Sequence, residues 1–190
     1  MSKIYLSDQT FEKISPSHNF LDQGEYENCT FKNCDFSNAD LSDFRFTNCQ
    51  FLACNLSLAK LTKTALREVT FKDCKMLGLH FEDCNPLGIS FGFDSCLLNH
   101  SSFYNCKIKK TVFKNTQLME VDFTASDLSA ALFDNCDLQG ATFEGTNLEK
   151  ADFRTAYNYT IDPVQNRLRK ARFSQSGIAG LLRNFDIEIE

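Results

Sequence analysis

Residues 111–155 read TVFKNTQLMEVDFTASDLSAALFDNCDLQGATFEGTNLEKADFRT, and this stretch decides the fold. Phenylalanine recurs in it every ten residues, leucine falls midway between, and a mostly small side chain precedes each of these centres by two positions. A helix places apolar residues at a spacing near 3.6 and a strand at a spacing of two, so a period of five fits neither. The pattern predicts the short sides of a coil, in which the centre and the residue two before it point inward.

The alternation of phenylalanine and leucine indicates four sides to each coil. Residues twenty apart then stack, and every column of centres is chemically uniform. The aromatic columns contain Phe93, Phe113, Phe133 and Phe153, and Phe103, Phe123 and Phe143; the aliphatic columns contain Leu98, Leu118 and Leu138, and Ile108, Leu128 and Leu148. We therefore predict an all-β fold, a square parallel β-helix in which coils stack at the strand spacing of about 4.8 Å.

The first half carries the same repeat in another phase, with centres from Tyr26 to Phe81. The step from Phe81 to Phe93 is twelve residues rather than ten, so about two extra residues enter near 85–92. We expect a protruding loop there, formed by Pro86, Leu87, Gly88 and Ile89. Three inward positions that usually hold small residues are bulky and predict local distortion of the coil: Phe44, Val69 and Leu79.

The two ends of a solenoid must be covered. We assign residues 1–23 to an irregular first coil, 24–156 to the repeat, and 157–190 to a last partial coil and a C-terminal capping and dimerisation segment. Apolar spacing predicts a short helix over 177–185, and alternation predicts a strand over 186–190. A homodimer through this segment would use Ile178, Leu181, Leu182, Phe185, Ile187 and Ile189.

Several stretches resemble the A(D/N)LXX unit of the pentapeptide-repeat family, among them Ala39-Asp40-Leu41-Ser42, Cys34-Asp35-Phe36-Ser37 and Ala151-Asp152-Phe153-Arg154. The resemblance covers roughly residues 24–156 and implies a right-handed quadrilateral β-helix. The order of coils, central break and C-terminal segment is also similar to that of the quinolone-resistance (Qnr and MfpA type) members. That narrower resemblance implies a dimeric rod that mimics DNA and binds DNA gyrase or topoisomerase IV, with a functional loop near Pro86.

All nine cysteines fall two residues before a centre: Cys29, Cys34, Cys49, Cys54, Cys74, Cys84, Cys96, Cys106 and Cys136. They could bind metal or serve redox chemistry, or they could fill the small inward position. The sequence has no C-x-x-C pair, and its three histidines fit no ligand spacing, so filling is favoured and no metal is predicted. The odd number of cysteines also favours a reducing compartment.

The net charge of −5 is uneven along the chain: −4 over residues 1–50, +3 over 51–111 and −5 over 112–155. Outward acids could form rows that stand in for DNA phosphates on a type II topoisomerase. The candidates are Asp35, Asp40, Asp43, Asp122, Asp127, Asp137, Glu144, Glu149 and Asp152. The alternative is that each Asp before a centre bonds locally to the backbone at a turn.

These observations exclude several classes of function. The sequence lacks a phosphate-binding glycine loop and the HExxH and G-x-S-x-G motifs, so we predict no enzymatic activity and no cofactor. The basic stretch around Lys107, Lys109 and Lys110 is too short to predict direct nucleic-acid binding. No segment is long and apolar enough to predict a membrane span or a signal peptide, so a cytoplasmic location is expected. An interaction module of undefined partner is the leading hypothesis, and the topoisomerase-binding DNA mimic is the alternative.

Overall fold

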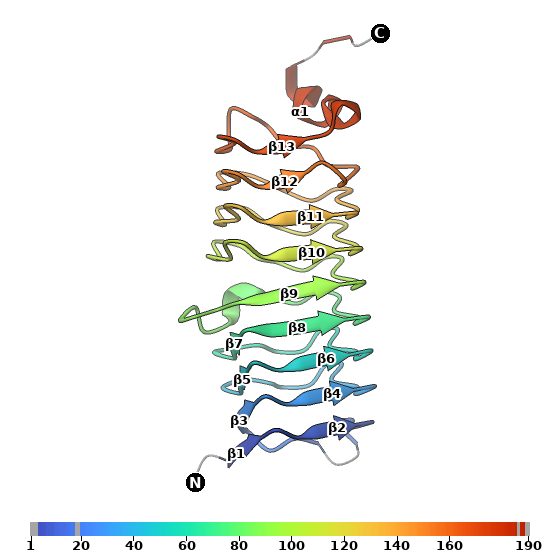
Figure 1. Ribbon diagram of the computed structural model, residues 1–190, viewed down its shortest axis with the longest axis vertical. Helices are drawn as coiled ribbons and strands as arrows, with labels where there is room; N and C mark the ends of the chain where they lie inside the picture. Colours follow the sequence, from blue (N-terminus) through green and yellow to red (C-terminus); the bar gives the residue numbers. More distant parts are fainter. Residues whose placement is uncertain (1–3, 18–19, 186, 189–190) are drawn as a thin grey trace.

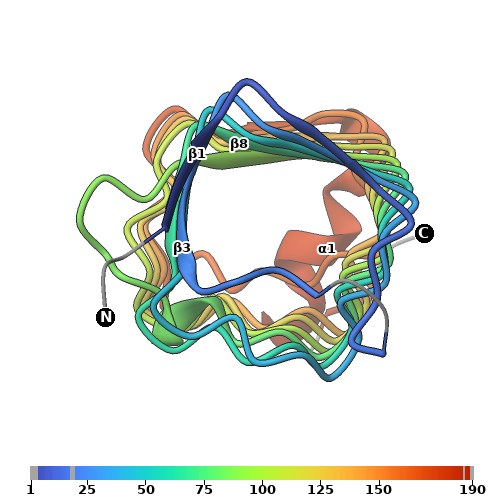
Figure 2. The same ribbon diagram turned by 90° about the horizontal axis from the view of Figure 1, so that it is seen from below.

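The computed structural model describes residues 4–17, 20–185 and 187–188. The chain winds as a parallel β-solenoid of about eight turns, as the five-residue period predicts (Figures 1 and 2). It is right-handed, as the family resemblance implies, and it carries a short C-terminal helix. Its strands are β1 (Ile4–Ser7), β2 (Thr10–Glu12), β3 (Gly24–Glu27), β4 (Thr30–Lys32), β5 (Arg45–Thr47), β6 (Gln50–Leu52), β7 (Ala65–Arg67), β8 (Val69–Lys72), β9 (Phe91–Asp94), β10 (Val112–Lys114), β11 (Leu132–Asp134), β12 (Asp152–Phe153) and β13 (Arg172–Phe173).

One side of the rod is a continuous nine-stranded sheet, in the order β13-β12-β11-β10-β9-β8-β6-β4-β2. A second, four-stranded sheet, β1-β3-β5-β7, covers the adjacent side in the first half only. Strand partners are twenty residues apart, as in Phe113 with Phe133. Between β8 and β9 the offset is twenty-two, so that Phe71 pairs with Phe93. The two extra residues lie in the loop that protrudes from the rod.

The centres are buried, and the aromatic columns stack ring on ring. Phe123, for example, has its ring centroid 5.2 Å from that of Phe103 and 5.1 Å from that of Phe143, with nearly parallel planes. Rings of neighbouring columns meet edge-on, as Phe113 meets Phe123 at 78°. Both arrangements are favourable for aromatic quadrupoles. The core is thus a set of interlocked aromatic and aliphatic columns.

The bulky inward residues of the first half are accommodated inside the rod. Phe44 is buried and stacks on Tyr26, while Gly24 and Thr64 hold the equivalent positions one coil before and one coil after. These small neighbours in the column leave room for the extra ring. A gap of about 10 Å³ lies among the core side chains around Thr64, which is at the limit for a single water molecule.

Most corners have a left-handed backbone at the residue two after the centre. Asn48, Asn115 and Asn135 take φ values near +50° there, and Gly140 takes +71°. Asparagine and glycine adopt this region at the lowest cost. The ladder from Asn135 to Asn115 adds a side-chain hydrogen bond of 2.9 Å between successive corners. The sequence reading did not assign this role to these residues.

Residues after β13 form a cap from three short helical segments: η2 (Gln175–Gly177), α1 (Ala179–Leu182) and η3 (Arg183–Phe185). A further helical turn, η1 (Phe81–Asp83), precedes the central loop. The predicted helix over 177–185 is therefore formed. The predicted strand is not seen at residues 187–188, and the rest of that segment lies outside the described residues. A strand needs a neighbouring strand for its ladder hydrogen bonds, and the helical turns place no strand beside these two residues.

We predict that Phe123→Ala destabilises the rod by roughly 3–5 kcal/mol, because it removes a fully buried ring between two stacked neighbours. Val112→Ala, at an outward position that is 42% exposed, is the matched control and should change stability by less than about 0.5 kcal/mol. Urea-induced unfolding followed by circular dichroism measures both. Equal midpoints for the two variants would contradict the inward assignment of the phenylalanine columns.

Candidate interaction surfaces

Three residues of each five face outward: the one before the centre and the two after it. The nine candidate acids fall on all four sides of the rod, because neighbouring repeats point in different directions. Asp40, Asp43, Asp122 and Glu144 share one side; Asp35 and Asp137 share a second, Asp127 and Glu149 a third, and Asp152 lies on the nine-stranded sheet. The structure therefore brings four of the nine onto one side and separates the others.

The aspartates before the centres make the local hydrogen bonds expected of a turn. Asp122 Oδ1 accepts the backbone N–H of Thr124 at 2.8 Å, and Asp137 Oδ1 accepts that of Gln139 at 3.1 Å. The same bond is made at Asp35, Asp40, Asp127 and Asp152. The interpretation of these residues as turn formers is confirmed, so their presence is explained without a partner.

Hydrogen bonds favour the ionised form at three of these aspartates: Asp40, Asp127 and Asp152. Hydrogen bonding by Ser42 lowers the pKa of Asp40, and the bond with Arg154 lowers the pKa of Asp152. At Asp127, partial burial acts to raise the pKa, but hydrogen bonds from Ser129 and Lys109 outweigh it and the pKa is lowered. Asp40, Asp127 and Asp152 therefore each contribute a full negative charge at neutral pH.

Ion pairs neutralise part of this charge. Asp40 pairs with Lys60 at 3.3 Å and Asp127 with Lys109 at 3.3 Å. Asp152 pairs with Arg154 at 2.8 Å on the nine-stranded sheet. The acids therefore do not form an unbroken row along the rod.

Charge is instead divided between two neighbouring sides. We define the acidic side as the side with centres at residues 41, 61, 81, 103, 123 and 143. It carries six acids and two bases, for a net charge of −4: Asp40, Asp43, Glu82, Asp83, Asp122 and Glu144 against Lys60 and Lys63. We define the basic side as the side with centres at residues 26, 46, 66, 108, 128, 148 and 168. It carries nine bases and five acids, for a net charge of +4: Arg45, Arg67, Lys107, Lys109, Lys110, Lys150, Arg167, Arg169 and Lys170 against Glu25, Glu27, Glu68, Asp127 and Glu149. Counting charge along the chain hides this division, whereas sorting it by position within the twenty-residue coil shows it.

The central loop protrudes from the basic side (Figure 2), where Pro86 replaces a centre. Leu87 at its tip is 72% exposed, and Ile89 is half-buried against the core. Gly88 has a φ of +73°. The loop is the one place in the repeat where the register changes, and it exposes apolar surface among cations.

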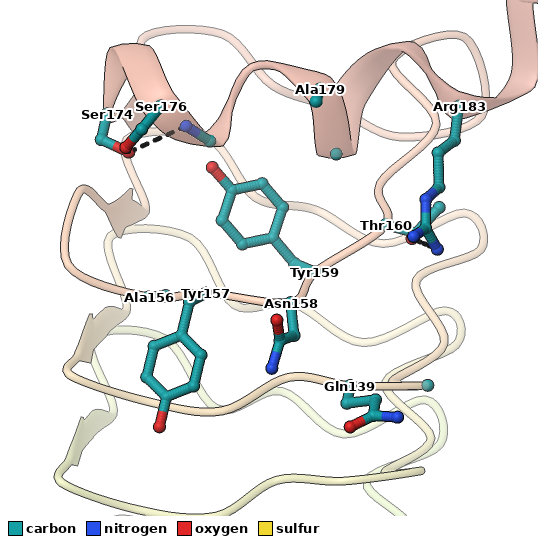
Figure 3. A pocket seen from close by; sticks show the side chains of 13 residues that line it. Gln139, Ala156, Tyr157, Asn158, Tyr159, Thr160, Ser174, Ser176, Ala179 and Arg183 are labelled. Atoms are coloured by element: carbon teal, nitrogen blue, oxygen red, sulfur yellow. Dashed lines mark hydrogen bonds between the residues drawn. The ribbon is translucent and has the colours of Figure 1, made fainter.

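The C-terminal cap covers the last coil and leaves an open cleft of about 630 Å³ beneath it (Figure 3). Tyr159 fills the end of the core, with its ring centroid 5.7 Å from those of Phe153 and Phe173. The repeat count places Asn158 at the centre position, but Asn158 is exposed, with φ +60°, and Tyr159 points inward instead. Arg183 of the cap donates to Thr160 at 3.3 Å. No carboxylate, histidine or cysteine is among the residues that line this cleft.

The six candidate dimer contacts have different positions in this cap. Leu181 packs against the core and Leu182 is half-buried. Ile178, Phe185 and Ile187 are each about half exposed. Ile189 lies outside the described residues. The cap thus presents three exposed apolar side chains near the C-terminus.

The nine cysteines are buried and unpaired by disulfides. Seven of the nine thiols donate to carbonyl oxygens of the preceding coil, as Cys49 does to Tyr26 at 3.3 Å and Cys136 does to Phe113 at 3.3 Å. Burial raises the pKa of Cys106 and of Cys136 to about 12. Within the described residues, no three His, Cys, Asp or Glu side chains are grouped as metal ligands. The cysteines therefore act as buried structural residues that also hydrogen-bond between coils.

The family model for the pentapeptide repeat region matches residues 25–92 and 89–157. The chain therefore belongs to the pentapeptide repeat family. No curated protein matches it. None of the helices in the described part of the chain has the length and apolar character needed to cross a membrane.

Three solved structures illustrate the likeness. QnrB1, a plasmid-mediated fluoroquinolone resistance protein, is 21% identical over 99% of this chain and 98% of its own, with a TM-score of 0.46. HetL, a pentapeptide repeat protein involved in heterocyst differentiation regulation from the cyanobacterium Nostoc, is 14% identical over 90% of this chain and 85% of its own, with a TM-score of 0.57. Rfr23 from the cyanobacterium Cyanothece is 13% identical over 90% of this chain and 84% of its own, with a TM-score of 0.23. At these identities the likeness concerns the fold alone.

We predict that none of the nine thiols reacts with Ellman's reagent in the folded protein at pH 8, and that nine react in guanidinium chloride. The reason is that the thiols are buried, and ionisation of Cys106 and Cys136 is further suppressed by their raised pKa. The folded pKa of Cys136 lies above the ordinary value of 9.0, so stability should also fall as pH rises from 9 toward 12. A thiol that reacts rapidly before unfolding would contradict a purely structural role.

Proposed function

We propose that the protein is a non-enzymatic interaction rod that uses its acidic side to bind a cationic surface of a partner protein. The observation that carries this proposal is the separation of charge, with a net −4 on the acidic side next to a net +4 on the basic side. Turn formation explains an Asp before a centre, but it does not explain why acids and bases are sorted onto different sides. A surface that recognises a partner by charge requires such sorting.

The interior supports a binding role rather than a catalytic one. Enzymes need a concave site with convergent polar groups. Here the core is filled by side chains, and the cleft beneath the cap is lined without a carboxylate, histidine or cysteine. General acid–base chemistry in that cleft would therefore be limited to the phenols of Tyr157 and Tyr159.

The rod also gives the acidic side a regular geometry. Equivalent positions of successive coils are separated by about 4.8 Å, the spacing of paired strands. Asp122, for instance, is bridged to Ser102 on one coil and to Thr142 on the next. Charges held on a rigid ladder meet a partner with little loss of backbone entropy.

A type II topoisomerase is the second candidate partner, with the acidic side standing in for DNA. The observation that favours it is the presence of Asp43, Asp122 and Glu144 on one side of a rigid rod. The mixed charge of the other sides limits such mimicry to one side. Contact would therefore be one-sided, and the protein would not replace the whole circumference of a duplex.

A quantitative pull-down tests both candidates. We expect the triple variant Asp43→Asn, Asp122→Asn, Glu144→Gln to lose at least roughly tenfold of the captured partner, because three charges of the interface are removed. The control Glu12→Gln, Glu68→Gln, Asp73→Asn removes the same charge from the other sides and should capture as much as the wild type. Binding should weaken strongly between 0.1 and 0.5 M salt, because the Debye length is about 10 Å at 0.1 M and shortens toward about 3 Å at 1 M.

Mass spectrometry of the captured proteins, from an extract of the protein's own cells, separates the candidates. A gyrase or topoisomerase IV subunit that the acidic-side variant loses would support the mimic. A different cationic partner with the same pattern would support the general module. Equal capture by both variants would overturn the assignment of the acidic side.

We also propose that two copies associate through the cap, because Ile178, Phe185 and Ile187 leave apolar surface exposed beside the chain terminus. Sedimentation equilibrium should give a dimer for the wild type and a monomer for Phe185→Asp with Ile187→Asp, since buried unpaired charge is costly at an interface. Val164→Asp, at a site that is 80% exposed, is the control and should remain dimeric. A monomeric wild type would rule out this interface.

A further inference from the structure

The two ends of the rod differ in how they are closed. At the C-terminal end, the helical cap and the ring of Tyr159 cover the last coil. At the N-terminal end, β1 and β2 are the terminal strands of their sheets, and in the described part of the chain neither has a strand on its outer edge (Figure 1). A first coil without a neighbour leaves ladder groups and core side chains uncovered.

The open edge of β2 consists of backbone groups that point away from the second coil. The Gln9 C=O accepts the Thr30 N–H at 2.8 Å, so the backbone groups of Gln9, and of every second residue after it, face β4. Consecutive residues of a parallel strand direct these groups to opposite neighbours. The N–H and C=O groups of Thr10 and Glu12 therefore face the open edge, where they can pair with one more strand.

The core is open at the same end. A cavity of about 370 Å³ lies over the first coil, among Leu6, Phe11, Ile14 and Phe20. Phe11 is partly buried and stacks on the fully buried Phe31, with ring centroids 5.1 Å apart and nearly parallel planes. A large side chain from a preceding strand would therefore lie over Phe11 as Phe11 lies over Phe31.

The charge at this end is negative. Residues 1–27 carry five acids and two bases, for a net charge of −3: Asp8, Glu12, Asp22, Glu25 and Glu27 against Lys3 and Lys13. Two of the acids, Glu12 and Asp22, line the cavity. Two such ends would repel each other, so the charge disfavours a second copy as the occupant and favours a strand that carries lysine or arginine.

We propose that the N-terminal end of the rod binds an extended segment of a partner protein as an added parallel strand on β2. An aromatic side chain of that segment enters the cavity and stacks on Phe11. The N–H and C=O of the same aromatic residue pair with the free backbone groups of Thr10 and Glu12. Lysine or arginine residues on either side of it face the negative charge. Backbone pairing supplies affinity, and the aromatic position supplies selectivity.

This site is separate from the surfaces proposed above. β2 belongs to the nine-stranded sheet, and the helical cap lies at the opposite end of the rod (Figure 1). A dimer formed through the cap would leave both N-terminal ends free. The acidic-side variant Asp43→Asn, Asp122→Asn, Glu144→Gln should therefore bind the added strand as the wild type does, so the two proposals fail independently.

Selection from a phage-displayed library of random twelve-residue peptides tests the site. We expect the folded wild-type protein to enrich peptides in which Phe, Tyr or Trp is flanked by Lys or Arg. The selected peptide is then made with a fluorescein label and with a single N-methyl group at one of two places. Methylation of the aromatic residue's N–H, which faces β2, should weaken binding at least roughly tenfold, because a hydrogen bond is lost. Methylation of the next residue's N–H, which faces away, should leave binding unchanged.

A pair of protein variants tests the same strand from the other side. Thr10→Pro removes an N–H that faces the open edge and none that faces β4, so the coil should fold and the peptide should bind at least roughly tenfold more weakly. Thr10→Ala keeps the N–H and is the matched control, which should bind as the wild type does. Circular dichroism checks the fold of both variants, and the methylated peptides decide the matter on the wild-type protein if Thr10→Pro does not fold.

Four outcomes would overturn the proposal. They are enrichment of acidic peptides, enrichment of peptides without an aromatic residue, no enrichment at all, and equal binding of the two methylated peptides. Full binding of the selected peptide by a folded Thr10→Pro variant would overturn it as well.

Discussion

The structure depends on one constraint, which is that a coil of four sides closes in twenty residues. Only then does each inward side chain lie directly on its equivalent in the next coil, as Phe113 lies on Phe93 and Phe133 at 5.3 and 5.0 Å. Two extra residues would shift every later column if they stayed in the wall. They lie in the loop instead, and the pairing of Phe71 with Phe93 restores the columns.

The second inward position explains why cysteine, serine, threonine and asparagine replace one another. These side chains are small, and most of them also donate a hydrogen bond to a carbonyl of the preceding coil, whereas Thr111 and Ser126 donate within their own coil. Cys49 donates to Tyr26 of the preceding coil at 3.3 Å, and Thr146 donates to Phe123 at 2.9 Å. Even Asn166, in the last coil, donates to Phe143 at 2.8 Å. The thiols therefore supply hydrogen-bond donors to buried carbonyl groups of the coils, which need partners.

Function in such a rod resides on the outside, because the inside is used for stacking. The outer sides differ little in backbone and much in charge, so recognition is decided by which residues occupy the three outward positions of each repeat. The acidic side is a departure from charge neutrality, and the central loop is a departure from the regular repeat. The rigid core holds both in place.

The five-residue period determined the fold class, the number of sides and the place of the central loop, because each follows from the spacing of apolar residues alone. It also identified the inward cysteines, and the helical spacing of apolar residues over 177–185 identified the cap. The ring that closes the end of the core was decided only by the tertiary structure, in which Tyr159 points inward and packs on Phe153 and Phe173. The acids were read as rows along the chain, yet only four share a side. Neighbouring repeats point in different directions, so the tertiary winding alone decides which charges meet.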